Sequence, residues 1–261
     1  MIRSRVREKL ANDEPVMMFK VCYNDPEIVE MACVLGFDAI WICTEHKKID
    51  PVILDSMIRA CRLTGTDAIV RVKPSNHSDV LPLLEMGTRG LLIPHIRSAE
   101  EAATIVEYAK FTPLGKRGLD LIHPDSGFGT VPLRQYQAEA NANTTIMVQI
   151  EDKEAIPHID EIASVEGVDG LFVGPGDLSN DLGHGGEPTH PSVEKVIDRV
   201  ADSCRKHGKI AGIAAGKPDL ARSYIEKGYR FFGGVSDYRF LINGIRDSIE
   251  NFQGAGFSFG K

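Results

Sequence analysis

Two acidic side chains stand directly behind two apolar runs of the sequence. Residues 145–150 are followed by Glu151, and residues 170–173 are followed by a Gly-Pro-Gly turn that carries Asp177. Taken singly, each acid has an ordinary alternative role, because Asp and Glu commonly cap helices and satisfy the amides of turns. As a pair at two strand ends they indicate one divalent cation, which takes carboxylate oxygens as ligands.

Arg71 and His46 add a cation and a base to this set. Arg71 interrupts an apolar run, and a buried guanidinium requires an anionic neighbour or an anionic ligand. An ion pair with Glu45 or with Glu151 would meet that requirement as well as a substrate would. His46 follows the second apolar run and could act as a general base, because imidazole titrates near neutral pH, although a lone loop histidine is more often inert.

Eight short runs, apolar on both faces, are the elements that would position these side chains. Most follow a helical pattern that closes on a glycine, as at Gly36, Gly65 and Gly208, and parallel strands covered by helices have this composition. A barrel of eight strand–helix units takes roughly 250 residues. We therefore predict a single (β/α)8 barrel over residues 1–261, with its catalytic groups at the carboxyl ends of the strands. The predicted strands lie near residues 16–21, 39–42, 68–70, 91–93, 145–150, 171–173, 210 and 231–232.

Helix starts fall between these runs, and one connection is irregular. Asp25 with Pro26, Ser98 with Glu101, and Pro218 have the residue types of helix N-termini. Residues 112–132, between the fourth and fifth strands, are rich in Gly, Pro and Asp and too long for an ordinary connection. They predict a mobile loop or a lid that faces the substrate.

Composition limits the possible partners. The 261 residues are 43% hydrophobic and 26% charged, which is ordinary for a globular protein. A net charge of -7 disfavours nucleic acid, and no apolar stretch approaches the roughly 20 residues that cross a bilayer. The five cysteines are scattered without CxxC spacing, so we expect reduced thiols and a cytoplasmic protein.

The motifs in order resemble those of the HpcH/HpaI aldolase family, the metal-dependent class II pyruvate aldolases. The resemblance extends from about residue 15 to 250, and the block at residues 167–179 is its most specific part. It rests on Glu45-His46, Arg71 with Pro74-Ser75, residues 148–151 and residues 167–179. The family fold implied is a phosphoenolpyruvate mutase-like barrel, with a C-terminal helix exchanged between subunits and a hexamer built as a trimer of dimers.

The resemblance also implies a reaction and residue roles. A 4-hydroxy-2-oxo acid, such as 4-hydroxy-2-oxoheptanedioate or a 2-keto-3-deoxy sugar acid, would be cleaved reversibly to pyruvate and an aldehyde through a metal-stabilised enolate. Glu151 and Asp177 would hold Mg²⁺, Mn²⁺ or Co²⁺. The substrate would contact Arg71, Gln149 and the amides of Gly176 and Asp177. Arg71 would stabilise the oxyanion, and His46, supported by Glu85, would remove the 4-hydroxyl proton.

Two departures from the family pattern bear on substrate choice. Cys43 stands three residues before His46, where the family usually has Asp, so the local negative charge is lower by one. Residues 120–129 differ from the arginine-bearing loop of well-known members, and His123 and Asp125 are the residues here that could alter the substrate, although such loop residues more often only make turns.

Two other functions fit the same residues. A related acyl-CoA or other carbon–carbon lyase would use the same enolate chemistry, but the sequence has no basic cluster for CoA. A catalytically silent barrel that binds a 2-oxo acid is the other alternative, and the Cys43 departure supports it.

Overall fold

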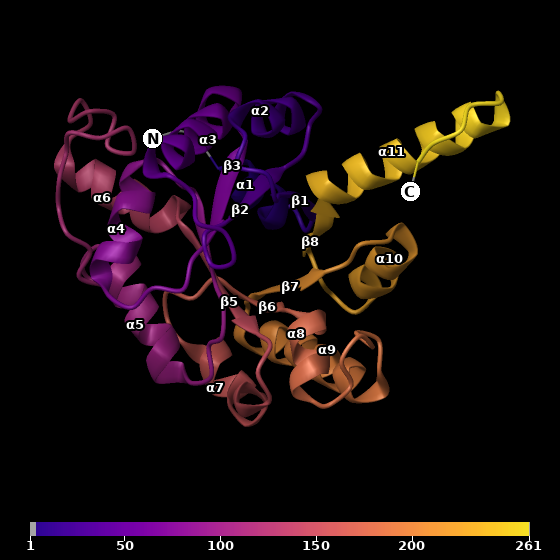
Figure 1. Cartoon of the computed structure of the whole chain (residues 1–261). Coiled ribbons are helices and arrows are strands. Elements are labelled where there is room, and N and C mark those ends of the chain that lie inside the picture. Colours follow the sequence, from indigo (N-terminus) through magenta and orange to yellow (C-terminus); the bar gives the residue numbers. More distant parts are fainter. Residues whose placement is uncertain (1–3, 261) are drawn as a thin grey trace.

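A closed barrel of eight parallel strands forms the centre of the computed structural model, which describes residues 4–260 (Figure 1). Each strand pairs with the next along the chain, and the last pairs with the first. The predicted (β/α)8 architecture is therefore confirmed. The strands are β1 (Val16–Val21), β2 (Ala39–Cys43), β3 (Asp67–Arg71), β4 (Gly90–Ile93), β5 (Thr145–Ile150), β6 (Gly170–Val173), β7 (Ile210–Ala214) and β8 (Phe231–Ser236).

Helices connect the strands, and their ends are fixed by local chemistry. The Asp25 and Ser98 side chains accept hydrogen bonds from backbone amides of the next helices, and Gly65 and Gly208 end theirs with φ of 71° and 63°. The helices are α1 (Arg5–Ala11), α2 (Pro26–Val34), α3 (Pro51–Thr64), α4 (His77–Glu85), α5 (Ala99–Ala109), α6 (Leu133–Asn143), η1 (Lys153–His158), α7 (Ile159–Ser164), α8 (Pro175–Asp181), α9 (Pro191–His207), α10 (Pro218–Glu226) and α11 (Asp237–Gly254).

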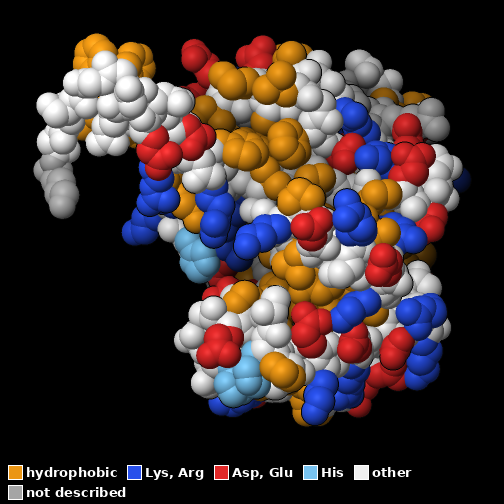
Figure 2. Space-filling view, turned by 90° about the vertical axis from the view of Figure 1, so that its right-hand side faces the viewer, with side chains coloured by type: hydrophobic (Ala, Val, Ile, Leu, Met, Phe, Trp, Pro, Cys, Tyr) orange, Lys and Arg blue, Asp and Glu red, His pale blue; other side chains and the backbone are white. Residues whose placement is uncertain are grey.

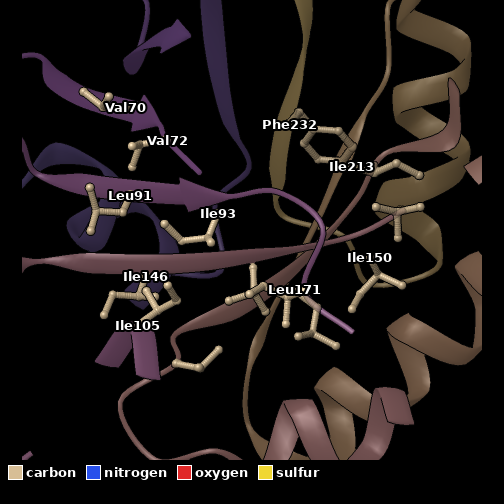
Figure 3. Close-up of a cluster of buried hydrophobic side chains, with 14 of the residues drawn as sticks. Val70, Val72, Leu91, Ile93, Ile105, Ile146, Ile150, Leu171, Ile213 and Phe232 are labelled. Atoms are coloured by element: carbon tan, nitrogen blue, oxygen red, sulfur yellow. The ribbon is translucent and has the colours of Figure 1, made fainter. Parts of the chain in front are cut away.

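The strands carry two apolar layers. Alternate residues such as Val70, Leu91 and Leu171 point outward and pack beneath the helices (Figure 3). The residues between them point inward and fill the barrel, among them Met18, Trp41, Ile69, Leu92, Met147 and Phe172. Since side chains alternate along a strand, the next inward positions after Ile69 and Met147 are Arg71 and Gln149.

The amino end of the barrel is closed by α1. Val6 packs into the inward-facing cluster, and Asp67, which opens β3, accepts hydrogen bonds from the Ser4 hydroxyl at 2.6 Å and the Val6 amide at 3.0 Å. This closure leaves the carboxyl end as the accessible mouth of the barrel.

The segment 112–132 is not a lid over this mouth within the chain. Asp125 lies 2.7 Å from Arg89 Nη1 and 3.3 Å from Arg117 Nη2, and it accepts a hydrogen bond from the Tyr136 hydroxyl. Arg89 immediately precedes β4, so this buried cluster lies toward the amino end of the barrel. His123 bonds within its own turn, to Ser126 and the Asp120 carbonyl. The prediction that His123 and Asp125 alter the substrate is wrong for a single chain, because His123 is buried in its own turn and Asp125 is buried against the two arginines and Tyr136.

Replacing Asp125 by Asn should destabilise the fold without a direct effect on the barrel mouth. The change leaves two buried guanidinium groups without their carboxylate, which typically costs about 3–5 kcal/mol. Urea unfolding would measure it, with Glu226→Ala, an exposed change at the end of α10, as the control. An unfolding free energy equal to that of the parent would contradict the structural role of this cluster.

The last helix, α11, projects away from the barrel (Figure 1). Its base is held by the stacking of Phe240 on Phe19, whose ring centres are 5.9 Å apart. Leu241, Ile245 and Phe252 are exposed along it, and hydrophobic side chains are visible on the projecting arm and on the adjacent barrel (Figure 2). None of the helices within residues 4–260 has the length and apolar character needed to cross a membrane.

Candidate active site

Inward-facing polar residues meet at the open mouth of the barrel. Cys43 ends β2, Arg71 ends β3, and Gln149 and Glu151 lie at the end of β5. All four are buried, and Glu151 is only 2% exposed. Their positions follow from the two-residue period of the strands, which also puts the apolar residues Ile69 and Met147 beneath them.

Arg71 forms an ion pair with Glu45, one of the two acids that the sequence allowed as its partner. Arg71 Nε lies 3.1 Å from Glu45 Oε2, and Arg71 Nη2 donates to Cys43 Sγ at 3.1 Å. The Nε contact has ion-pair distance without hydrogen-bond geometry, so this N–H has no hydrogen-bond acceptor among the described residues. Glu45 and Cys43 therefore hold the guanidinium in place at the mouth.

Glu151 is held from three sides. Its carboxylate accepts hydrogen bonds from Gln149 Nε2 at 2.9 Å and from the His95 amide at 3.0 Å. On the third side is Gly174, because a Cβ there would lie 2.5 Å from Glu151 Oε2. Gly174 thus lets the ends of β5 and β6 approach closely, a role that the strand pattern alone does not reveal.

The pKa of Glu151 is raised to about 7: burial raises it most and the negative charge of Asp177 raises it as well, whereas His95 and Arg71 lower it. The two carboxylates are therefore close enough to act on one another electrostatically. Asp177 and Gly176 lie in the first turn of α8 and are exposed, and a Cβ on Gly176 would meet no atom within 4 Å. Open space for a ligand thus adjoins the acidic pair.

His95 is a site residue that the sequence analysis missed. Its Nε2 lies 3.3 Å from Glu45 Oε1 and its Nδ1 lies 3.1 Å from Asp152 Oδ2, so the ring connects the ends of β2 and β5. Its φ of 57° is unusual for a residue other than glycine and aims the amide at Glu151. The sequence does carry a signal for His95, because it stands two residues after β4 and therefore at the carboxyl end of a strand.

The structure brings His46 to the mouth but not to Glu85. The His46 side chain is 61% exposed, and its Nε2 lies 3.8 Å from Glu45 Oε2. Glu85 is the last residue of α4, at the amino end of the barrel, where its carbonyl accepts the Asp125 amide and its charge acts on Tyr136. The expected support of His46 by Glu85 is therefore not formed within one chain, because α4 carries Glu85 to the opposite end.

A second acidic group lies outside the mouth. Asp152, Glu154 and Asp181 each offer an oxygen, and these oxygens lie within 4.8 Å of one another, a spacing compatible with a metal ion. Two of these acids are already engaged, Asp152 with His95 and Arg97, and Asp181 with the Lys153 amide. Glu151 also accepts two hydrogen bonds, but Glu151 and Asp177 lie at the mouth beside Arg71 and open space, so we consider them the better candidates.

A closed parallel barrel with polar side chains gathered at the carboxyl ends of its strands has the architecture of a (β/α)8-barrel enzyme. The family model described as HpcH/HpaI aldolase/citrate lyase matches residues 16–244. The chain belongs to this family, and it is a carbon–carbon lyase.

Individual relatives agree with this assignment. A 5-keto-4-deoxy-D-glucarate aldolase of Klebsiella pneumoniae is 37% identical over 82% of each chain. A 2-dehydro-3,6-dideoxy-6-sulfogluconate aldolase of Pseudomonas putida is 34% identical over 84% of this chain and 85% of that protein. The solved structure of an HpcH/HpaI aldolase from Desulfitobacterium hafniense DCB-2 has a TM-score of 0.90 at 27% identity and covers 95% of this chain and 96% of that one.

Proposed function

We propose that the protein is a divalent-metal-dependent aldolase that reversibly cleaves a 4-hydroxy-2-oxo acid to pyruvate and an aldehyde. The observation that carries this proposal is the buried Glu151 carboxylate, repelled by Asp177 and flanked by the Arg71 guanidinium at the open mouth. The substrates named for the relatives, 5-keto-4-deoxy-D-glucarate and a sulfogluconate derivative, support a 2-keto-3-deoxy acid or 4-hydroxy-2-oxoheptanedioate as the substrate class.

The side chains present fit a divalent cation. Glu151 and Asp177 would supply carboxylate oxygens for Mg²⁺, Mn²⁺ or Co²⁺, and no cation within ion-pair distance neutralises the Asp177 carboxylate among residues 4–260. Gln149 Oε1 is buried without a hydrogen-bond partner, so it too is available to the ion or the substrate. When bound, the metal would act as a Lewis acid toward the 2-oxo acid.

The chain's own residues would carry the remaining steps. The amides of Gly176 and Asp177 would receive the substrate carboxylate, and the Arg71 guanidinium would donate to the enolate oxygen as negative charge develops. His46 would take the 4-hydroxyl proton, the C3–C4 electron pair would remain on the pyruvate enolate, and C4 would become the aldehyde carbon. Exposure of His46 leaves its ring free to meet a substrate.

The assembly is part of the same proposal. The exposed apolar residues of α11 support a helix exchanged between subunits, within a homo-oligomer that we expect to be a trimer of dimers. We treat residues 1–261 as one catalytic domain. The five free cysteines support a cytoplasmic location, where thiols stay reduced.

Metal removal tests the proposed reaction. We expect pyruvate release from 4-hydroxy-2-oxoglutarate to stop after treatment with EDTA and to return when Mn²⁺, Co²⁺ or Mg²⁺ is added. A coupled assay that consumes pyruvate measures the rate. Undiminished cleavage after complete removal of metal would refute the mechanism.

The related acyl-CoA lyase is the second candidate, since the matching family model includes citrate lyases. It would release pyruvate from none of these substrates. Exchange of solvent deuterium into the methyl group of pyruvate separates the candidates, because only a pyruvate-binding enzyme catalyses it.

A further inference from the structure

A cavity of about 410 Å³ opens beside the proposed pyruvate site and has no assigned role. Cys43 and His46 form its border with the mouth, and Lys20, Lys47, Tyr23 and Tyr238 also line it. Because Cys43 also contacts Arg71, the cavity adjoins the site that would hold the 2-oxo acid. A group bonded to C4 of that acid would extend into such a space.

The wall of this cavity is basic. Lys20, Lys47 and His46 line it, and none of its lining residues is acidic. The two acids that adjoin the lining residues are already engaged: Asp237 accepts the amides of Cys22 and Tyr23, and Glu45 pairs with Arg71. The cavity therefore offers positive charge that the described part of the protein does not neutralise.

Lys20 is the unusual member of this wall. It faces inward on β1, two residues after Met18, and is paired in register with Trp41 on β2. Its Nζ lies 4.7 Å from the centre of the Trp41 ring, and Arg71 Cζ lies 5.1 Å from the same centre. No carboxylate forms an ion pair with Lys20 within residues 4–260. A half-buried ammonium at this position lacks an anion that a ligand would supply.

We infer that Lys20 is a specificity-determining residue that, with Lys47, binds a negatively charged end group on the aldehyde half of the substrate. The inference rests on the proposed function, because it takes the pyruvoyl half to lie against Arg71 and Glu151. Lys20 Nζ and Arg71 Cζ lie 4.7 Å and 5.1 Å from the centre of the same indole ring, so a small acid with an anionic group at each end would contact both cations. The preferred substrate then carries an anionic group at each end, and the distal anion takes no part in breaking C3–C4.

The test compares two aldehydes of similar size in aldol synthesis with pyruvate and Mn²⁺: succinic semialdehyde, which is anionic, and butanal, which is neutral. We expect the wild-type protein to show the higher kcat/KM with succinic semialdehyde. Lys20→Met should reduce that preference by about 10- to 100-fold, the range for loss of one charged hydrogen bond. Lys20→Arg should retain most of it. The matched control is Lys195→Met on the exposed face of α9, which should leave the preference unchanged.

Each other outcome has a definite meaning. An equal loss with both aldehydes in Lys20→Met would overturn the inference and leave Lys20 as a packing partner of Trp41. If the wild-type protein shows no preference for succinic semialdehyde, the inference about Lys20 is also overturned. Turnover of pyruvate in the same assay would still support the proposed function. If Lys20→Met does not fold, the wild-type preference should still shrink as ionic strength rises, and a salt-independent preference would reject the inference. Absence of both aldol formation and methyl exchange would reject the proposed function itself.

Discussion

Replacing Glu151 by glutamine is expected to reduce kcat/KM for pyruvate release by at least about 1,000-fold, because loss of the bound Lewis acid removes several kcal/mol of transition-state stabilisation. The amide oxygen of glutamine can still accept the bond from the His95 amide, and its NH₂ group can donate to Gln149 Oε1 once that amide turns over, so the fold should persist. Binding of Mn²⁺, followed by calorimetry or by its paramagnetism, should weaken in parallel with activity.

Glu154→Gln is the matched control, since it removes an acid from the neighbouring exposed group without touching the barrel mouth. We expect it to bind Mn²⁺ and to turn over substrate at nearly the parental rate. The opposite pattern, with metal lost in Glu154→Gln and kept in Glu151→Gln, would assign the ion to Asp152, Glu154 and Asp181 instead.

The same Glu151 substitution should stabilise the metal-free protein at alkaline pH. The pKa of Glu151 is raised from 4.5 to about 7, so the native state holds this proton more tightly than the unfolded chain does. The contribution of the protonated Glu151 carboxyl group to the free energy of unfolding is fully present below pH 4.5 and is lost as pH rises through about 7. At pH 8 the metal-free variant should gain up to about 3 kcal/mol over the parent in denaturant unfolding, and no gain would show that Glu151 titrates normally.

Replacing Arg71 by lysine is expected to lower kcat by about 100- to 1,000-fold, the usual effect of losing one oxyanion donor. Lysine keeps the positive charge beside Glu45, but it lacks the planar set of donors that reaches Glu45, Cys43 and a ligand together. Mn²⁺ affinity should change little, because Arg71 is not a proposed metal ligand. This separation of kcat from metal affinity distinguishes its role from that of Glu151.

Arg59→Lys, a similar change in an exposed helix pair, serves as the control and should have the parental kcat. If Arg71→Lys also retains the parental kcat, Arg71 is only the partner of Glu45, and oxyanion stabilisation must be assigned to another group. Methyl exchange in pyruvate is the more direct readout, because it measures enolate formation without an aldehyde.

Part of the site could be predicted because it depends on local rules. The run at residues 145–150 forms a strand with the predicted bounds, and its two-residue period places Gln149 and then Glu151 at the inner end of the barrel. The same rule places Arg71. Residue types at the helix ends, such as Asp25 and Gly65, likewise act through their own neighbours in the chain.

Other parts could not be predicted, because they depend on which distant residues the barrel brings together. Glu85 matched a family motif, but the direction of α4 takes it to the end opposite His46. Asp125 stands in a loop with the composition of a lid, yet it neutralises two buried arginines, Arg117 in the same loop and Arg89, which precedes β4.

By itself, the sequence determined eight strands, the caps of several helices and the strand ends from which Arg71, Glu151 and Asp177 emerge, since each depends on residues a few positions apart. Only the tertiary structure decided that Arg71 pairs with Glu45, that His95 joins Glu45 to Asp152, and that Lys20 lies over Trp41 without an acidic partner among residues 4–260. These contacts are set by the register between neighbouring strands and by the closure of the barrel. Neither can be predicted from the spacing of residues along the chain.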